Sequence, residues 1–279
     1  MSRRNSSTQA MFVNHPPESL TLDLTRCCVP TQSNGSPIDT FYETIRHTLT
    51  LGQPDQLRDS PTLGRLLILG LVTGTEAYFR TTLFGLTSFC PLAKDSLADS
   101  EIAFGAIDFY GADQAALGLF ERVSFAGKLG IKEMSKKIAG LTWVDRSSLG
   151  VAVSDFEKVC HMRHAAVHSQ GVLNRGNARA LGLGRSTGAM NVVVDMPHFH
   201  MAAKACTNLV REYNRSLYEH IVQRWIRERI LVGRWSDDRK FFQPFIDLMR
   251  SQEDGLMRGT AYSVYRTLQS GILNRYASP

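Results

Sequence analysis

The sequence predicts an all-α fold, and three observations support this prediction. After Ser60-Pro61 no proline recurs until Pro91, and the stretch between them is apolar on most of its sides. Residues 197–232 carry apolar residues at helical spacing. Ser or Asp followed closely by Pro, the start signal of a helix, precedes several such stretches. Strand-like alternation is confined to residues 20–24 and 190–195.

The composition is that of a soluble globular protein. Hydrophobic residues make up 43% and charged residues 21% of the chain. The net charge of +6 permits nucleic acid or another polyanion as partner without establishing one. The five cysteines are odd in number and never form C-x-x-C, so neither a disulfide framework nor a cysteine zinc site is expected.

No targeting or membrane segment is expected. The first residues are polar and lack the apolar region of a signal peptide. The apolar run at residues 66–75 is too short to span a bilayer. With the cysteine pattern, these features predict a cytoplasmic protein that does not contact membranes.

Composition shifts and start signals divide the chain. Ser36-Pro37 begins a short helix that Gly52 and Pro54 stop. Further helices are expected to begin near residues 197 and 236, with a last one at 256–273. The expected segments are an N-terminal arm with one short helix at 1–57, a helical domain at 58–232 and a C-terminal helical extension at 233–279.

The stretch after Ser60-Pro61 should form a central helix. Gly70 and Gly74 share one face of it, where another helix can approach closely. Glu76 and Arg80 stand one turn apart, which fits a solvated ion pair. Alternatively, Glu76 is a buried supporting carboxylate that meets Arg163 or His164.

Residues 92–140 predict two or three shorter helices. Lys128, Lys132, Lys136 and Lys137 form either a solvated helix face or a rim that faces RNA. The next helix begins near Ser148 or Ser154 and should end at Gly171.

Residues 160–175 bring together three histidines and two arginines. No Asp or Glu occurs from position 158 to 194, whereas five Lys or Arg do, so the local field should attract anions. Within this stretch Arg163, His164 and His168 form R-H-x-x-x-H. This resembles the R-x4-6-H motif of the HEPN family, whose members are all-α ribonucleases.

Over residues 61–232 the resemblance implies a HEPN-like helical bundle that cleaves RNA without a metal or other cofactor. It makes Arg163 and His168 the catalytic pair and His164 the polar position between them. It also implies a homodimer. A role as toxin or abortive antiviral effector, with an antitoxin or an activating protein as partner, rests on the resemblance alone.

The residue types suit this chemistry. An imidazole that titrates near neutrality can take the proton of an RNA 2′-hydroxyl or protonate the leaving oxygen, which are the roles expected for His168. The guanidinium of Arg163 can stabilise charge on the phosphoryl oxygens, and His164 would orient one of the two or hold the phosphate. At ~100° per residue, Arg163 and His168 lie about 140° apart on an ideal helix and do not readily form a compact pair, and a twofold dimer offers a way to combine them.

A Gly- and Arg-rich segment follows the motif. It lacks the residue order of a phosphate-binding P-loop, so a mobile basic loop is expected instead of a nucleotide site. The residues predicted to bind the RNA backbone are Arg175, Arg179 and Arg185, with Lys128 and Lys132 from the lysine cluster.

Three other interpretations of the motif remain open. His161, His164 and His168 share a helix face and could bind a transition metal, although no Glu stands among them as in H-E-x-x-H. The domain could instead be a non-catalytic HEPN-like module that binds another effector or a nucleotidyltransferase. The histidines could also be structural residues of the core whose ring nitrogens bond to one another.

Overall fold

A computed structural model describes residues 24–29, 35–184, 188–255 and 259–277. Within these ranges the chain forms helices and no β-strand, so the predicted all-α class is confirmed. The stretch at 190–195 contributes one isolated antiparallel bridge, between Val172 and Asn191. None of the described helices is both long enough and apolar enough to cross a membrane.

The chain divides into two units, Met1–Asn34 and Gly35–Pro279. In the first unit, the described residues 24–29 contain the short turn η1 (Leu24–Arg26), and most of the strand-like stretch at 20–24 lies outside the described residues. The second unit holds one hydrophobic core that runs from Ile38 to Ile272. The expected boundaries at 57/58 and 232/233 therefore do not separate compact units, because the helices on either side of them share this core.

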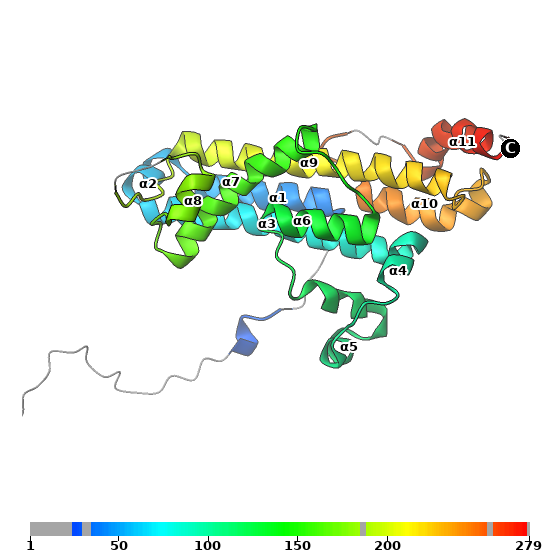
Figure 1. Cartoon of the computed structure of the whole chain (residues 1–279), viewed down its shortest axis with the longest axis horizontal. Coiled ribbons are helices and arrows are strands. Elements are labelled where there is room, and N and C mark those ends of the chain that lie inside the picture. Colours follow the sequence, from blue (N-terminus) through cyan, green and yellow to red (C-terminus); the bar gives the residue numbers. More distant parts are fainter. Residues whose placement is uncertain (1–23, 30–34, 185–187, 256–258, 278–279) are drawn as a thin grey trace, which may run out of the picture. The chain divides into compact units, whose positions relative to one another are not determined.

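The second unit is a bundle of long helices (Figure 1). The bundle helices are α1 (Pro37–Leu51), α3 (Pro61–Phe89), α7 (Ser148–His168), α9 (Met196–Arg227) and α10 (Trp235–Met249). The other elements of this unit are α2 (Pro54–Asp59), α4 (Pro91–Leu97), α5 (Phe104–Tyr110), η2 (Ala112–Phe120), α6 (Lys128–Met134), η3 (Ser135–Ala139), α8 (Arg175–Ala180) and α11 (Ala261–Ala277).

Helix α3 is the central helix, as its apolar composition predicts. It contacts α1, α7, α9 and α10, and Leu71, Val72 and Phe79 on it are completely buried. Both ends of α3 lie where a capping serine and a proline in the sequence predict them. The Ser60 hydroxyl accepts a hydrogen bond from the Leu63 N–H at 3.3 Å, and the helix ends before Pro91.

The two glycines of α3 allow α1 to approach closely. A Cβ atom on Gly70 would lie 3.3 Å from the Thr48 methyl group, and one on Gly74 would lie 3.0 Å from that of Thr44. The predicted close approach at this face is therefore confirmed, and its partner is α1. Helix α1 is consequently part of the bundle.

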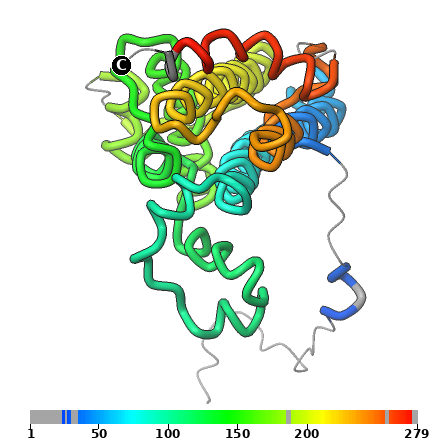
Figure 2. Tube along the Cα trace, turned by 90° about the vertical axis from the view of Figure 1, so that its right-hand side faces the viewer, coloured from blue at the N-terminus to red at the C-terminus, as the bar shows by residue number. Residues whose placement is uncertain are grey.

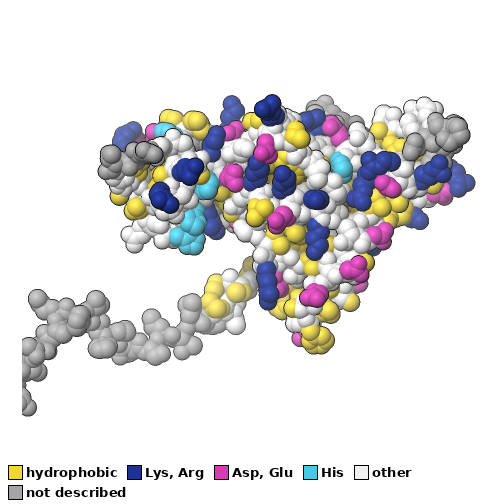
Figure 3. All heavy atoms as spheres, in the orientation of Figure 1, with side chains coloured by type: hydrophobic (Ala, Val, Ile, Leu, Met, Phe, Trp, Pro, Cys, Tyr) yellow, Lys and Arg dark blue, Asp and Glu magenta, His cyan; other side chains and the backbone are white. Residues whose placement is uncertain are grey.

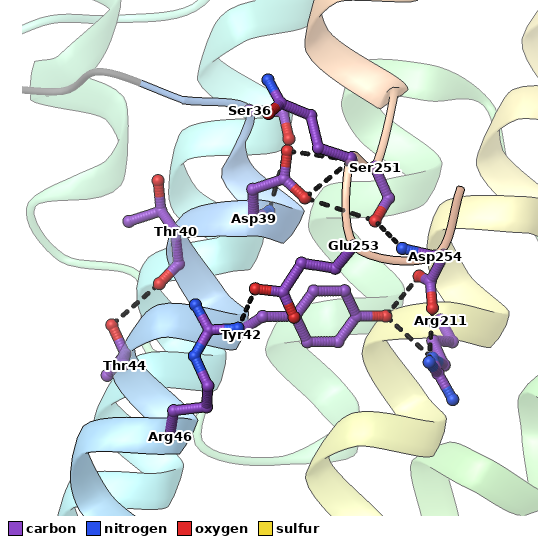
Figure 4. A network of polar contacts seen from close by, with 11 residues as sticks. Ser36, Asp39, Thr40, Tyr42, Thr44, Arg46, Arg211, Ser251, Glu253 and Asp254 are labelled. Atoms are coloured by element: carbon purple, nitrogen blue, oxygen red, sulfur yellow. Dashed lines mark hydrogen bonds and ion pairs between the residues drawn. The ribbon is translucent and has the colours of Figure 1, made fainter. Parts of the chain in front are cut away.

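A polar network ties α1 to α9 and to the segment after α10 (Figure 4). The Tyr42 hydroxyl donates to Asp254 at 2.5 Å and accepts a hydrogen bond from the Arg211 Nε atom at 2.8 Å. Burial and the neighbouring Asp254 carboxylate raise the pKa of Tyr42, so this hydroxyl keeps its proton at neutral pH. The N-terminal end of α1 is thus fixed on the bundle.

Between α4 and α6 the chain leaves the bundle and forms what we call the acidic protrusion, residues 98–121. It contains α5 and η2, which pack against each other. The end of η2 contacts α3, and α5 stands away from the long helices in both views (Figures 1 and 2). This part of the sequence carries Asp99, Glu101, Asp108, Asp113 and Glu121, and no Lys or Arg.

Candidate functional site

The R-H-x-x-x-H motif occupies the last two turns of α7. The Ser147 hydroxyl accepts a hydrogen bond from the Gly150 N–H at 3.1 Å and starts this helix. Its end lies where the sequence predicts it, because Gln170 and Gly171 adopt φ values of 52° and 96°, which stop a right-handed helix. The N–H groups of Ser169 and Gly171 both donate to the Ala165 carbonyl.

The histidines of the motif share one face of α7, as their spacing predicts. His164 and His168 are exposed, and their ring centroids are 4.6 Å apart. His161 is half-buried, with its Nδ1 atom 3.2 Å from the Oδ1 atom of Asn177 on α8. In the part of the chain that the structure describes, no three His, Cys, Asp or Glu side chains are grouped so as to hold a metal ion.

Arg163 lies on a different side of α7 from His168. Ala166 and Val167, one turn after Arg163, line a hollow of about 490 Å³ together with Thr62, Arg65 and Leu66 of α3. Arg163 is half-buried on this side, and its Nε atom has no hydrogen-bond partner among the described residues. A single α7 therefore does not bring Arg163 and His168 into one compact pair.

Arg65 is a basic residue near the motif that sequence reasoning missed. Its guanidinium lies against Gly171, where an added Cβ would be 2.7 Å from the Nη1 atom. Its Nη2 atom donates to the Thr62 hydroxyl at 3.0 Å. The only available signal was a charged residue within an apolar helix, and only the packing of α3 against α7 shows that it lies near the motif.

Helix α8 places two of the predicted RNA-binding residues beside the motif helix. Arg175 and Arg179 are exposed, one turn apart, and form no ion pair within the described ranges. They border a hollow of about 950 Å³ that is also lined by Leu173, Ala178 and Met190. Arg185 lies outside the described residues. Histidine and Lys or Arg side chains gather at this end of the molecule (Figure 3).

The two lysines predicted to bind RNA lie far from the motif. Lys128 forms an ion pair with Asp145 at 2.9 Å, next to the start of α7, and Lys132 is exposed on the same helix α6. The motif is at the other end of α7, which at 1.5 Å per residue is about 30 Å long. An RNA strand would have to extend along the whole of α7 to contact both the motif and these two lysines.

Glu76 forms no hydrogen bond or ion pair with Arg80, Arg163 or His164, so neither partner proposed for this carboxylate from the sequence is the one it has. It accepts hydrogen bonds from the Phe125 N–H at 2.8 Å and from the Ser124 hydroxyl at 3.2 Å. Arg80 donates to the carbonyls of Phe120 and Val123. Both side chains therefore fasten the chain to α3 where it returns from the acidic protrusion.

Replacing Glu76 with Ala is expected to lower the free energy of unfolding by about 1.5–3 kcal/mol, because the Phe125 N–H loses a charged acceptor. Hydrogen exchange of the Phe125 amide should accelerate in the same variant. Glu43→Ala is the matched control, since Glu43 is exposed on α1 and has no bonded partner in the described ranges. Unchanged exchange at Phe125 would contradict the fastening role.

Cys160, at the start of the motif stretch, does not have the character of a nucleophile. It is buried, and desolvation raises the pKa of its thiol, so the reactive thiolate is disfavoured. The accessible titratable groups at this end of α7 are His164 and His168.

Comparison with known proteins adds no further assignment: no family model, no curated protein and no solved structure matches this chain.

Proposed function

We propose that the protein is a metal-independent endoribonuclease whose active site lies at the C-terminal end of α7. The observation that carries the proposal is the exposed pair His164 and His168, with adjacent rings, in a stretch of the chain, positions 158–194, that contains no Asp or Glu. Two neighbouring imidazoles can exchange protons with a substrate near neutral pH. The exposed Arg175 and Arg179 offer positive charge to an RNA backbone beside them.

The proposed reaction is an internal transesterification. Neutral His168 removes the proton of a ribose 2′-hydroxyl, and the 2′-oxygen attacks the adjacent phosphorus. The bond from phosphorus to the 5′-oxygen breaks, and that oxygen receives a proton from an imidazolium. The products are a 2′,3′-cyclic phosphate and a 5′-hydroxyl end, so no metal-activated water is needed. His164 would hold the phosphate or orient His168.

Arg163 is proposed to stabilise the phosphoryl oxygens from the second subunit of a twofold dimer. The motivation is that Arg163 and His168 lie on different sides of α7, so within one subunit they cannot both contact the same phosphate. In an isologous contact each α7 meets its copy, so the arginine of one subunit can face the histidines of the other.

Light scattering is therefore expected to give the mass of a dimer for the active protein. Exposed Val167, next to His168 on α7, would be covered at this contact, so Val167→Glu should yield monomers without activity. Met201→Glu is the matched control, because Met201 is an exposed apolar residue of α9. A monomer that still cleaves RNA would exclude the composite site.

The alternative is a non-catalytic HEPN-like module that binds an anionic or protein partner. The separation of Arg163 from His168 in one chain favours it, since binding does not require both groups at one phosphate. The two proposals differ in whether purified protein cleaves RNA at all.

For the cellular setting we propose, from the family resemblance, a cytoplasmic toxin or antiviral effector. An antitoxin or an activating protein would then control it. The absence of a membrane-crossing helix among the described residues is compatible with this setting.

The experiment that tests the proposed chemistry uses a short RNA with one cleavage site. Cleavage is expected to persist in excess chelator and to stop when the ribose 5′ of the scissile phosphate is replaced by deoxyribose, because the nucleophile belongs to the substrate. If chelator abolished cleavage and the deoxyribose substrate were still cut, a metal-bound water would be the nucleophile and the proposal would fail. Absence of cleavage by the dimeric protein would favour the binding module.

A further inference from the structure

The acidic protrusion exposes large apolar side chains at its tip. Phe104 and Phe109 are 82% and 81% exposed, and Ile107 is 40% exposed. Exposed rings of this size cost solvation free energy and mark interaction surfaces when they cluster. Asp108 lies one turn after Phe104 on α5, so a ring and a carboxylate share one face.

The charge of the protrusion is opposite to that of the chain as a whole. All five of its acidic side chains are exposed, and none forms an ion pair within the described ranges. Acidic and apolar side chains gather together over α5 (Figure 3). The chain as a whole, protrusion included, carries a net charge of +6. A partner for this surface should therefore combine positive charge with an apolar hollow.

A surface with these properties exists on the same chain, at α8. Arg175 and Arg179 border a hollow of about 950 Å³ whose apolar lining comes from Leu173, Ala178 and Met190. No Asp or Glu occurs between positions 158 and 194 to oppose an incoming carboxylate. The hollow can accept an aromatic ring while the two guanidiniums pair with carboxylates beside that ring.

Within one chain the two surfaces do not meet. Helix α8 packs on α7 at the left-hand end of the bundle in Figure 1, whereas the protrusion emerges below the right-hand half. A symmetric contact between two protrusions would place like charges opposite each other, which is unfavourable. The remaining arrangement joins the protrusion of one chain to the α8 surface of another.

We infer that a second copy of this chain docks its acidic protrusion on the α8 hollow, in a head-to-tail contact. Because the two surfaces differ, the contact is heterologous and can repeat from copy to copy. The protrusion offers carboxylates and aromatic rings, which correspond to the phosphates and bases of single-stranded RNA. Self-association and RNA would then compete for Arg175 and Arg179. This competition, unlike the contact itself, rests on the proposed function.

The test is a charge swap measured by sedimentation, on protein freed of nucleic acid by nuclease and high-salt chromatography. Wild type is expected to associate with rising concentration at low salt, beyond any dimer formed through α7. The protrusion swap Asp108→Lys/Asp113→Lys and the α8 swap Arg175→Glu/Arg179→Glu should each weaken this association about tenfold or more. An equimolar mixture of the two swaps should associate again, because each altered surface then meets its complement.

Two further variants make the result specific. Phe104→Ser/Phe109→Ser removes only exposed rings, so it should fold normally and lose the association. Glu43→Lys/Glu133→Lys changes the net charge as much as the protrusion swap does, at exposed positions outside both surfaces, and should associate like wild type.

Three outcomes would overturn the inference: a wild type that does not associate with concentration, single swaps that associate normally, or a mixture of swaps that stays dispersed. Association that disappears with nuclease treatment would show bridging by RNA instead. None of these readouts needs RNA cleavage, so a failed nuclease proposal leaves the head-to-tail contact testable by itself.

Discussion

Replacing His168 with Ala is expected to lower the rate of RNA cleavage by about 10²–10⁴-fold, the usual contribution of a general acid or base. The thermal midpoint of unfolding should stay unchanged, because His168 is exposed and its ring lies beside that of His164, which is also exposed. Single-turnover cleavage of a short RNA, with circular dichroism on the same samples, measures both quantities.

His47→Ala is the matched control, since His47 is exposed on α1 and outside the proposed site. Arg163→Lys should also lose about 10²-fold or more in rate, because an ammonium keeps the charge but not the planar fork of donors. The lysine variant is preferable to alanine here, since Arg163 is half-buried and its truncation could disturb the packing of α7 on α3. Full activity in His168→Ala would exclude this residue as acid or base.

Replacing Asp238 with Ala is expected to lower the free energy of unfolding by about 2–4 kcal/mol, the largest stability effect that we predict. Its carboxylate is 1% exposed and accepts hydrogen bonds from the N–H groups of Val232 and Gly233, each at 2.9 Å, and from the Tyr265 hydroxyl. Truncation leaves these buried donors without an acceptor. Urea denaturation followed by fluorescence measures the loss.

The neighbouring Asp237 provides the control. It is partly exposed and pairs with Arg234 at the surface, so Asp237→Ala should cost less than about 1 kcal/mol. If both variants lost the same free energy of unfolding, the buried hydrogen bonds of Asp238 would contribute little, and the effect would come from the negative charge at the start of α10.

The sequence by itself determined the class of the fold and the ends of its main helices. Ser60 caps the helix that it was predicted to start, α7 begins at Ser148, one of its two predicted starts, and Gly171 follows the end of α7. These features are local, because a cap bonds to a backbone group within one helical turn and a left-handed residue ends a helix wherever it stands. The same periodicity placed His161, His164 and His168 on one face.

Only the tertiary structure decided what distant side chains contact. Glu76 has a residue within one turn that could neutralise it, yet it binds the backbone of Phe125, because the chain returns from the acidic protrusion against α3. Asp238 lies in the first turn of α10, where its carboxylate could bond to nearby backbone groups alone, but it also binds Tyr265 of α11. Helical spacing says how far apart Arg163 and His168 stand around α7, whereas the packing of α3 against α7 decides which of them is covered. Such contacts depend on how helices cross and where loops return, and no pattern within a few residues encodes either.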